Sequence, residues 1–178
     1  MARAAGAGFW AILRQFPAEN PCGNLAAQAL ANGNADQLGR VYTSWSQAAP
    51  ADPQVQAEYL MIGLLIRPFE PGFATRAADL IRQYPANAVC RMAQALALWR
   101  ANRSVEAAAL LDGQNIPFAD EPRFALIRGL ILSSVGRSAE SEKMFAIAAA
   151  AKLLPAEQSL LKQAADRNRS GPAGSKSP

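Results

Sequence analysis

The stretch GLILSSVGRSAESEKMFAIA, residues 129–148, contains residue types from which a phosphate-binding loop is built. Such a loop needs Gly-x-x-x-x-Gly-Lys-Ser/Thr between a strand and a helix, because backbone N–H groups must surround the phosphates. Here Ile131 replaces the first glycine, Arg137 replaces the lysine, and helix-forming residues precede the turn. We therefore expect Gly136-Arg137-Ser138 to be the turn of a helical hairpin, and we expect no nucleotide or other cofactor.

Other groups with catalytic potential lack the partners that catalysis needs. The chain has no histidine, so a serine nucleophile has no imidazole base, and no Gly-x-Ser-x-Gly elbow occurs. Acidic pairs occur at Asp120-Glu121 and at Glu140 with Glu142. We interpret both as solvent-facing charges, because the first begins a predicted helix and the second is beside Lys143. We expect no enzyme, and a small all-α enzyme or ligand-binding bundle is the alternative.

The two cysteines, Cys22 and Cys90, are far apart and have no second cysteine or histidine nearby. A zinc site built from cysteine and histidine is therefore excluded, and no metal site is predicted. We expect two small, buried, reduced side chains rather than a disulfide.

Most of the net charge of +4 lies in the last twelve residues, RNRSGPAGSKSP. Arg167, Arg169 and Lys176 supply +3 there, with no acid, so the rest of the chain carries only +1. A segment rich in Ser, Gly and Pro cannot pack, so residues 169–178 are predicted to be a disordered tail. The nearly neutral remainder argues against a nucleic-acid partner, although an RNA-binding helical repeat is a further alternative.

The first residues, MARAAGAGFWAILRQFP, resemble a secretory signal only superficially, because Arg14 interrupts the apolar segment and no small-x-small cleavage site follows. The apolar runs 59–66 and 144–154 are shorter than the roughly 18 residues that cross a bilayer. We expect no membrane span and a cytoplasmic location.

Turn-forming residues divide the chain into segments with the length of ordinary globular helices. Alanine dominates and no β-branched run typical of a strand occurs, so we expect an all-α fold. Ser104 and Ser138 are expected to cap helix starts, and Gly33, Asn102 and Gly136 to lie in turns. The expected helices are 8–16, 23–31, 35–47, 53–66, 74–83, 88–101, 104–111, 121–135, 138–152 and 155–168.

Two neighbouring stretches repeat each other at a displacement of 34 residues. AVCRMAQALALWRANRSVEAAALL, from Ala88, aligns with PRFALIRGLILSSVGRSAESEKMF, from Pro122. Small residues, large apolar residues and helix breaks coincide. The aligned pairs are Ala95 with Gly129, Leu98 with Leu132, Asn102 with Gly136, Ala107 with Ser141, and Leu111 with Phe145. A displacement of 34 is the tetratricopeptide period.

The second stretch resembles a tetratricopeptide repeat, a helix-turn-helix unit that stacks into a right-handed superhelix. The small, large, turn, small, large, small signature is carried by Gly129, Leu132, Gly136, Ser141, Phe145 and Ala148. Small residues let the two helices approach, and the large ones fill the space between neighbours. The resemblance implies an α-solenoid of stacked antiparallel helix pairs, each covering the apolar face of the one before it.

The resemblance weakens towards the N-terminus, where RPFEPG lengthens one turn. Arg128 and Ala125 also stand where the family usually has large apolar residues. The segment AKLLPAEQSLLKQA is similar to the end of large, poorly characterised bacterial tetratricopeptide proteins. The expected organisation is an N-terminal helix or cap at 1–21, about four hairpins at 22–152 with the best at 88–113 and 121–152, a capping helix at 153–168, and the tail.

By the same resemblance, a protein partner, as an extended peptide or a helix, lies in a groove lined by the first helix of each pair. The corresponding residues here are Val89, Met92, Leu96, Trp99, Arg100, Arg123, Leu126, Leu130 and Ser133. The functional interpretation is a groove for an apolar segment with an acidic flank. The alternative is that this apolar stripe is core, which is the usual fate of such stripes. The loop 116–122 is a further candidate contact, and its alternative is an ordinary packed loop, because Ile116 and Phe118 need covering. The aromatic pair Phe9-Trp10 also needs a cover.

Overall fold

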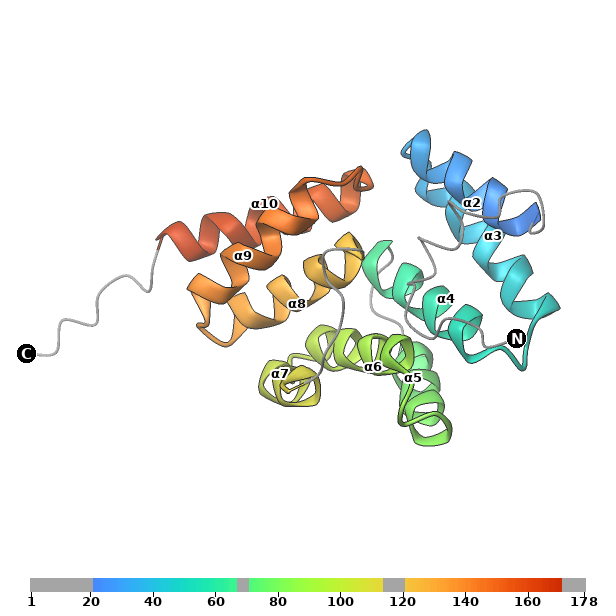
Figure 1. The fold of residues 1–178 in the computed structure, drawn as a ribbon, viewed down its shortest axis with the longest axis horizontal. Helices are drawn as coiled ribbons and strands as arrows, with labels where there is room; N and C mark the ends of the chain where they lie inside the picture. Colours follow the sequence, from blue (N-terminus) through green and yellow to red (C-terminus); the bar gives the residue numbers. More distant parts are fainter. Residues whose placement is uncertain (1–20, 67–70, 114–120, 171–178) are drawn as a thin grey trace, which may run out of the picture.

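A computed structural model describes residues 21–66, 71–113 and 121–170 of the chain (Figure 1). All regular structure in these ranges is helical, so the predicted all-α class is confirmed for them. The helices are α2 (Pro21–Ala31), α3 (Ala35–Ala48), α4 (Pro53–Ile66), α5 (Pro71–Gln83), α6 (Ala88–Arg100), α7 (Ser104–Leu111), α8 (Pro122–Ser134), α9 (Ser138–Ala149) and α10 (Pro155–Ser170).

Most helix bounds agree with the sequence within a few residues, and the differences concern ends. Helix α5 begins at Pro71 rather than 74, and α9 ends at Ala149 rather than 152. Helix α10 continues through Arg169 and Ser170, where the tail was predicted to begin. The expected helix 8–16, with Phe9-Trp10, lies outside the described residues, as do residues 116–120 of the candidate loop.

Side chains of Asn and Asp, rather than the predicted serines, cap several helix starts. Asn34 Oδ1 accepts a hydrogen bond from the Gln37 N–H at 2.9 Å, and Asn87 Oδ1 accepts from Val89 and Cys90. The expectation for Ser104 and Ser138 is wrong, because arginines occupy the cap positions before them and make no side-chain cap bond. Each serine is instead the first residue of its helix.

Three interhelical turns share one backbone geometry. Gly33, Asn102 and Gly136 have φ values of 64°, 60° and 80°, in the left-handed region. In each turn a following N–H donates to a carbonyl five residues earlier, from Asn34 to Ala29, from Arg103 to Leu98, and from Arg137 to Leu132. This bond closes the end of the preceding helix. The turns predicted at these positions are therefore confirmed.

Small residues bring paired helices together where the sequence predicted. A Cβ on Gly129 of α8 would lie 2.5 Å from Phe145 Cε1 of α9, and one on Gly63 of α4 would lie 2.4 Å from Phe73 Cε2 of α5. Ser141 Oγ also donates to the Gly129 carbonyl at 2.9 Å. The absence of a Cβ therefore lets each aromatic ring lie directly on the helix it faces.

The chain curves so that its C-terminal helix reaches its N-terminal hairpin. Figure 1 shows α8, α9 and α10 on one side, α2, α3 and α4 on the other, and α5, α6 and α7 below them. Helix α10 contacts α4 as well as its neighbours α8 and α9. Leu154, just before α10, is fully buried in the cluster formed by Leu38, Tyr42 and Val55. The two ends of the described chain thus share a core.

No helix among the described residues is long and apolar enough to cross a membrane.

Candidate functional site

A polar groove runs across the carboxyl ends of α6, α8 and α10. It consists of two adjoining hollows, of about 390 and 570 Å³, which share Ser134 and Arg167. We call it the C-end groove. Its lining residues are Trp99, Arg100, Asn102, Ser104, Ser133, Ser134, Gly136, Ser138, Asp166, Arg167, Asn168 and Ser170.

The groove is built from corresponding positions of three alternate helices, α6, α8 and α10. Trp99, Ser133 and Arg167 are each 34 residues apart, and the residues that follow them, Arg100, Ser134 and Asn168, have the same spacing. The displacement found between the two best hairpins therefore continues into α10. Helix α10 contacts α8 and α8 contacts α6, so the ends of the three helices lie next to one another.

Hydrogen bonds between the helices fix the side chains of the groove. Trp99 Nε1 donates to Ser134 Oγ at 2.8 Å, and Ser134 Oγ donates to the Leu130 carbonyl at 2.9 Å. Ser133 Oγ donates to Asn168 Oδ1 at 2.7 Å, which links α8 to α10. Because each bond joins a groove residue to a packed helix, the groove has a defined shape before any partner binds.

The charge of the groove is mainly positive. Among the described residues, the hollow beside Trp99 is lined by Arg100 and Arg167 and by no acidic side chain. The guanidinium of Arg100 lies 6.0 Å from the centre of the Trp99 ring. The second hollow includes Asp166, whose carboxylate pairs with Arg169. Among the described residues, Arg167 forms no ion pair.

Most of the apolar residues predicted to line a groove are buried instead. Met92, Leu96, Leu126 and Leu130 have no exposed surface. Leu126 and Leu130 pack against Leu153 and Ala164, beside and within α10. For these four the alternative interpretation, that the stripe is core, describes the structure.

Of the other predicted groove residues, only some line the C-end groove. Trp99 and Arg100 line the C-end groove and are partly exposed, and Val89 is partly exposed on the first turn of α6. Arg123 does not line it, because its guanidinium donates to both carboxylate oxygens of Glu157, at 2.6 and 3.0 Å. The Arg123 side chain is 12% exposed and that of Glu157 is 0% exposed. This pair attaches α10 to α8 and is no contact for a partner.

A buried acid cluster lies where α10 approaches the N-terminal hairpins. Glu58 is 3% exposed, and its Oε2 accepts a hydrogen bond from the Tyr42 hydroxyl at 3.0 Å. Burial raises the pKa of Glu58 well above its ordinary value, and it also raises that of Tyr42. Glu121 is 1% exposed, so the expectation that it faces solvent is wrong. The prediction used only the neighbouring charges in the sequence, and these do not show that another part of the chain covers Glu121.

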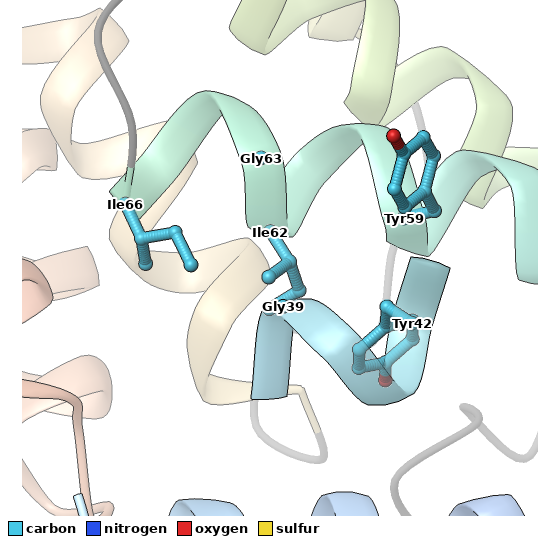
Figure 2. Close-up of a pocket in the computed structure, with 6 residues that line it drawn as sticks. All are labelled: Gly39, Tyr42, Tyr59, Ile62, Gly63 and Ile66. Carbon is cyan, nitrogen blue, oxygen red and sulfur yellow. The ribbon is translucent and has the colours of Figure 1, made fainter. Parts of the chain in front are cut away.

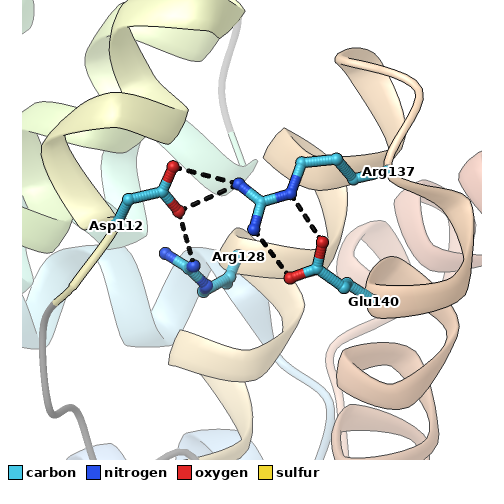
Figure 3. A network of polar contacts seen from close by, with 4 residues as sticks. All are labelled: Asp112, Arg128, Arg137 and Glu140. Carbon is cyan, nitrogen blue, oxygen red and sulfur yellow. Dashed lines mark hydrogen bonds and ion pairs between the residues drawn. The ribbon is translucent and has the colours of Figure 1, made fainter.

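The arginine of the candidate phosphate loop is held in a surface network (Figure 3). Arg137 donates to Asp112, the residue after α7, and to Glu140 in the first turn of α9. Arg128 donates to the same Asp112 carboxylate at 2.9 Å. These contacts lower the pKa values of Asp112 and Glu140, chiefly through the Arg137 hydrogen bonds. Residues Glu140 and Glu142 are exposed, as expected.

The turn itself uses its backbone donors internally. The N–H of Gly136 donates to the Ser133 carbonyl and that of Arg137 to the Leu132 carbonyl, at 3.2 and 3.0 Å. A phosphate-binding loop needs such N–H groups to point at its ligand. The observed geometry is that of a helix end.

Two other features are unsuited to ligands. The crevice between α3 and α4, lined by Gly39, Tyr42 and Ile62 among others (Figure 2), has about 10 Å³, which is room for no more than one water. Cys22 and Cys90 are both free thiols, and burial raises the pKa of Cys90 to about 11. Within the described ranges, no group of three or more potential metal ligands occurs.

Comparisons with protein-family models, with curated proteins and with solved structures find no match to this chain. The functional argument therefore depends on the geometry of the C-end groove.

Several groove residues were not found from the sequence. Ser134, Arg167 and Asn168 were not predicted, and Arg167 was placed beside a disordered tail. The missing step was to extend the 34-residue displacement from α8 into the last helix, where it aligns Ser133 with Arg167.

Proposed function

We propose that this chain is a non-catalytic, tetratricopeptide-like scaffold that holds a segment of a protein partner in its C-end groove. The observation that carries the proposal is that the same two positions of the alternate helices α6, α8 and α10, 34 residues apart, line two adjoining hollows. A surface formed side by side from corresponding helix positions is suited to an elongated ligand, because it extends across several helices.

The groups in the groove favour binding over catalysis. They are hydroxyls, two amides, guanidinium groups, an indole and the carboxylate of Asp166, which is paired with Arg169. Ser134 is already hydrogen-bonded to a backbone carbonyl. A nucleophile needs an adjacent base, and the chain has no histidine to supply one. The right-handed superhelix, the relation to bacterial tetratricopeptide proteins and the cytoplasmic location are further parts of this proposal.

A groove-filling variant tests the proposed function. Arg167→Trp places a large ring in the space shared by the two hollows, whereas Lys162→Trp adds the same ring at an exposed position on the same helix. Affinity capture followed by mass spectrometry should recover a partner with the native chain and with Lys162→Trp but not with Arg167→Trp. Equal recovery by both variants would show that partners bind elsewhere.

A further inference from the structure

We infer that the segment held in the C-end groove is acidic and extended, a run of Asp and Glu residues rather than an apolar helix. This inference rests on the proposed function, and it specifies the chemistry of the partner.

The first argument is that the apolar surface needed by an amphipathic helix is covered. Leu126 and Leu130 of α8 are fully buried against α10, and Met92 and Leu96 of α6 are fully buried in the central core. A helix docks by burying apolar side chains in a groove. Beside these helices the C-end groove, whose lining residues are mostly polar, remains open.

The second argument is charge. Arg100 and Arg167 line the hollow beside Trp99, and no acidic side chain of the part of the chain that the structure describes lines it with them. The carboxyl ends of α6, α8 and α10 bring three negative dipole ends, and the amino ends of α7 and α9, at Ser104 and Ser138, oppose two of them. The remainder is about half a negative charge, which is less than the charge of two guanidinium groups. The two guanidinium groups therefore set the sign of the field, and carboxylates complement it.

The third argument is the kind of polar group that lies between the charges. Ser104 and Asn102 offer a hydroxyl and an amide group, which suit the N–H and C=O groups of an extended backbone. A helix has already paired most of those groups internally, so it gains less from them. The partly exposed Trp99 ring adds a flat surface for one side chain of the segment.

Labelled peptides test the inference directly on the full chain. The probes are a fluorescein-labelled peptide of about ten residues with alternating Glu and Gly, the same peptide with Gln in place of Glu, and an oligouridylate of similar extended length. Fluorescence anisotropy measures binding at about 50 and 300 mM salt, since exposed ion pairs weaken on screening. The Glu peptide should bind about tenfold more tightly than the Gln peptide at the lower salt.

A matched pair of variants locates the site. Arg100→Gln with Arg167→Gln should weaken the Glu peptide about tenfold, because the carboxylates lose charged partners. Arg40→Gln with Arg82→Gln removes the same charge from exposed positions on α3 and α5 and should leave binding unchanged. If Arg100→Gln reduces stability, Arg167→Glu serves alone, because Arg167 is exposed; this variant should reject the Glu peptide and bind a Lys-Gly peptide.

The outcomes separate this inference from the proposed function. Equal binding of the Glu and Gln peptides, or binding of neither, overturns the acidic partner, while loss of a captured partner in Arg167→Trp still supports the scaffold. Tighter binding of oligouridylate than of the Glu peptide would show that the groove binds a nucleic acid rather than an acidic protein segment. If the Arg40 and Arg82 control loses as much affinity as the groove variant, the attraction is general and not local to the groove.

Discussion

The carboxyl group of Glu58 is buried in the core, between the hydroxyl of a tyrosine and the side-chain amide of a glutamine. Tyr42 donates to its Oε2 at 3.0 Å, and Gln54 Nε2 donates to its Oε1 at 3.3 Å. Burial raises its pKa, the two hydrogen bonds lower it, and the nearby charges of Glu121 and Asp52 raise it further. The net effect favours the protonated form in the folded chain.

Glu58→Gln is predicted to flatten the dependence of stability on pH. The folded state keeps a proton that the unfolded chain loses near pH 4.5. The stabilisation is therefore complete below that pH and is lost as the pH rises through the raised folded pKa, at about 1.4 kcal/mol per pH unit for one proton. Glutamine does not ionise, so it has no such loss. The free energy of unfolding, measured with urea from about pH 5 to pH 8, should therefore decline less steeply in the variant.

Glu142→Gln is the control for this measurement, because Glu142 is exposed on α9. Its pH profile should follow that of the unchanged chain. Parallel profiles for Glu58→Gln and the unchanged chain would mean that Glu58 is already ionised when folded.

At the scale of elements, the α8 and α9 pair shows how a single small residue sets a helix contact. The Phe145 ring lies where a Cβ on Gly129 would be, with Cε1 and Cδ1 at 2.5 and 2.6 Å from that position, and Met144 Cβ lies 3.3 Å from it. Ala95, the residue 34 positions earlier, has a Cβ, and Leu111 of its core cluster corresponds to Phe145. Phe145 is larger than the corresponding Leu111, and the residue that it faces, Gly129, is smaller than the corresponding Ala95.

Gly129→Ala is predicted to destabilise the chain by about 1–3 kcal/mol, because the added methyl overpacks the contact with Phe145. Gly72→Ala on α5 is the control, since a Cβ there meets nothing within 4 Å. Urea unfolding should show a loss for the first variant and none for the second, for which alanine is the better helix former. Adding Phe145→Leu to Gly129→Ala should restore part of the loss, and equal effects of the two alanines would exclude overpacking.

The element scale is also where the sequence was most informative. Helix bounds depend on local chemistry, such as proline at the first turn and the left-handed residues Gly33, Asn102 and Gly136, so they were predicted within a few residues. The serine caps failed because Arg103 and Arg137 occupy those cap positions and pair with Glu106 and Glu140, three residues later. Whether the serine or the arginine before it takes the cap position depends on backbone angles. The residue types alone did not determine these angles.

At the scale of the whole molecule, the contact between the two ends of the described chain was not predicted. Leu154 enters the N-terminal cluster, Lys152 Nζ donates to the Ala31 carbonyl in α2, and Pro155 lies beside Gly33. These contacts join residues more than a hundred positions apart, and nothing in a 34-residue pattern specifies them. The burial of Glu121 was missed for a related reason, because another segment of the chain covers it. The burial of the apolar groove stripe was the alternative interpretation of the sequence, and it is the one that the structure shows.

Leu154→Ala is predicted to loosen the N-terminal helices, although it lies next to α10. Its side chain is fully buried among Leu38, Tyr42 and Val55, so the cavity should cost about 2–5 kcal/mol and speed amide hydrogen exchange in α2, α3 and α4. Leu153→Ala is the matched control, because the adjacent Leu153 packs with Leu126 and Leu130 instead. That control should speed exchange mainly in α8 and α10. If both variants affect only α8, α9 and α10, the ends do not share a core in solution and the array is open.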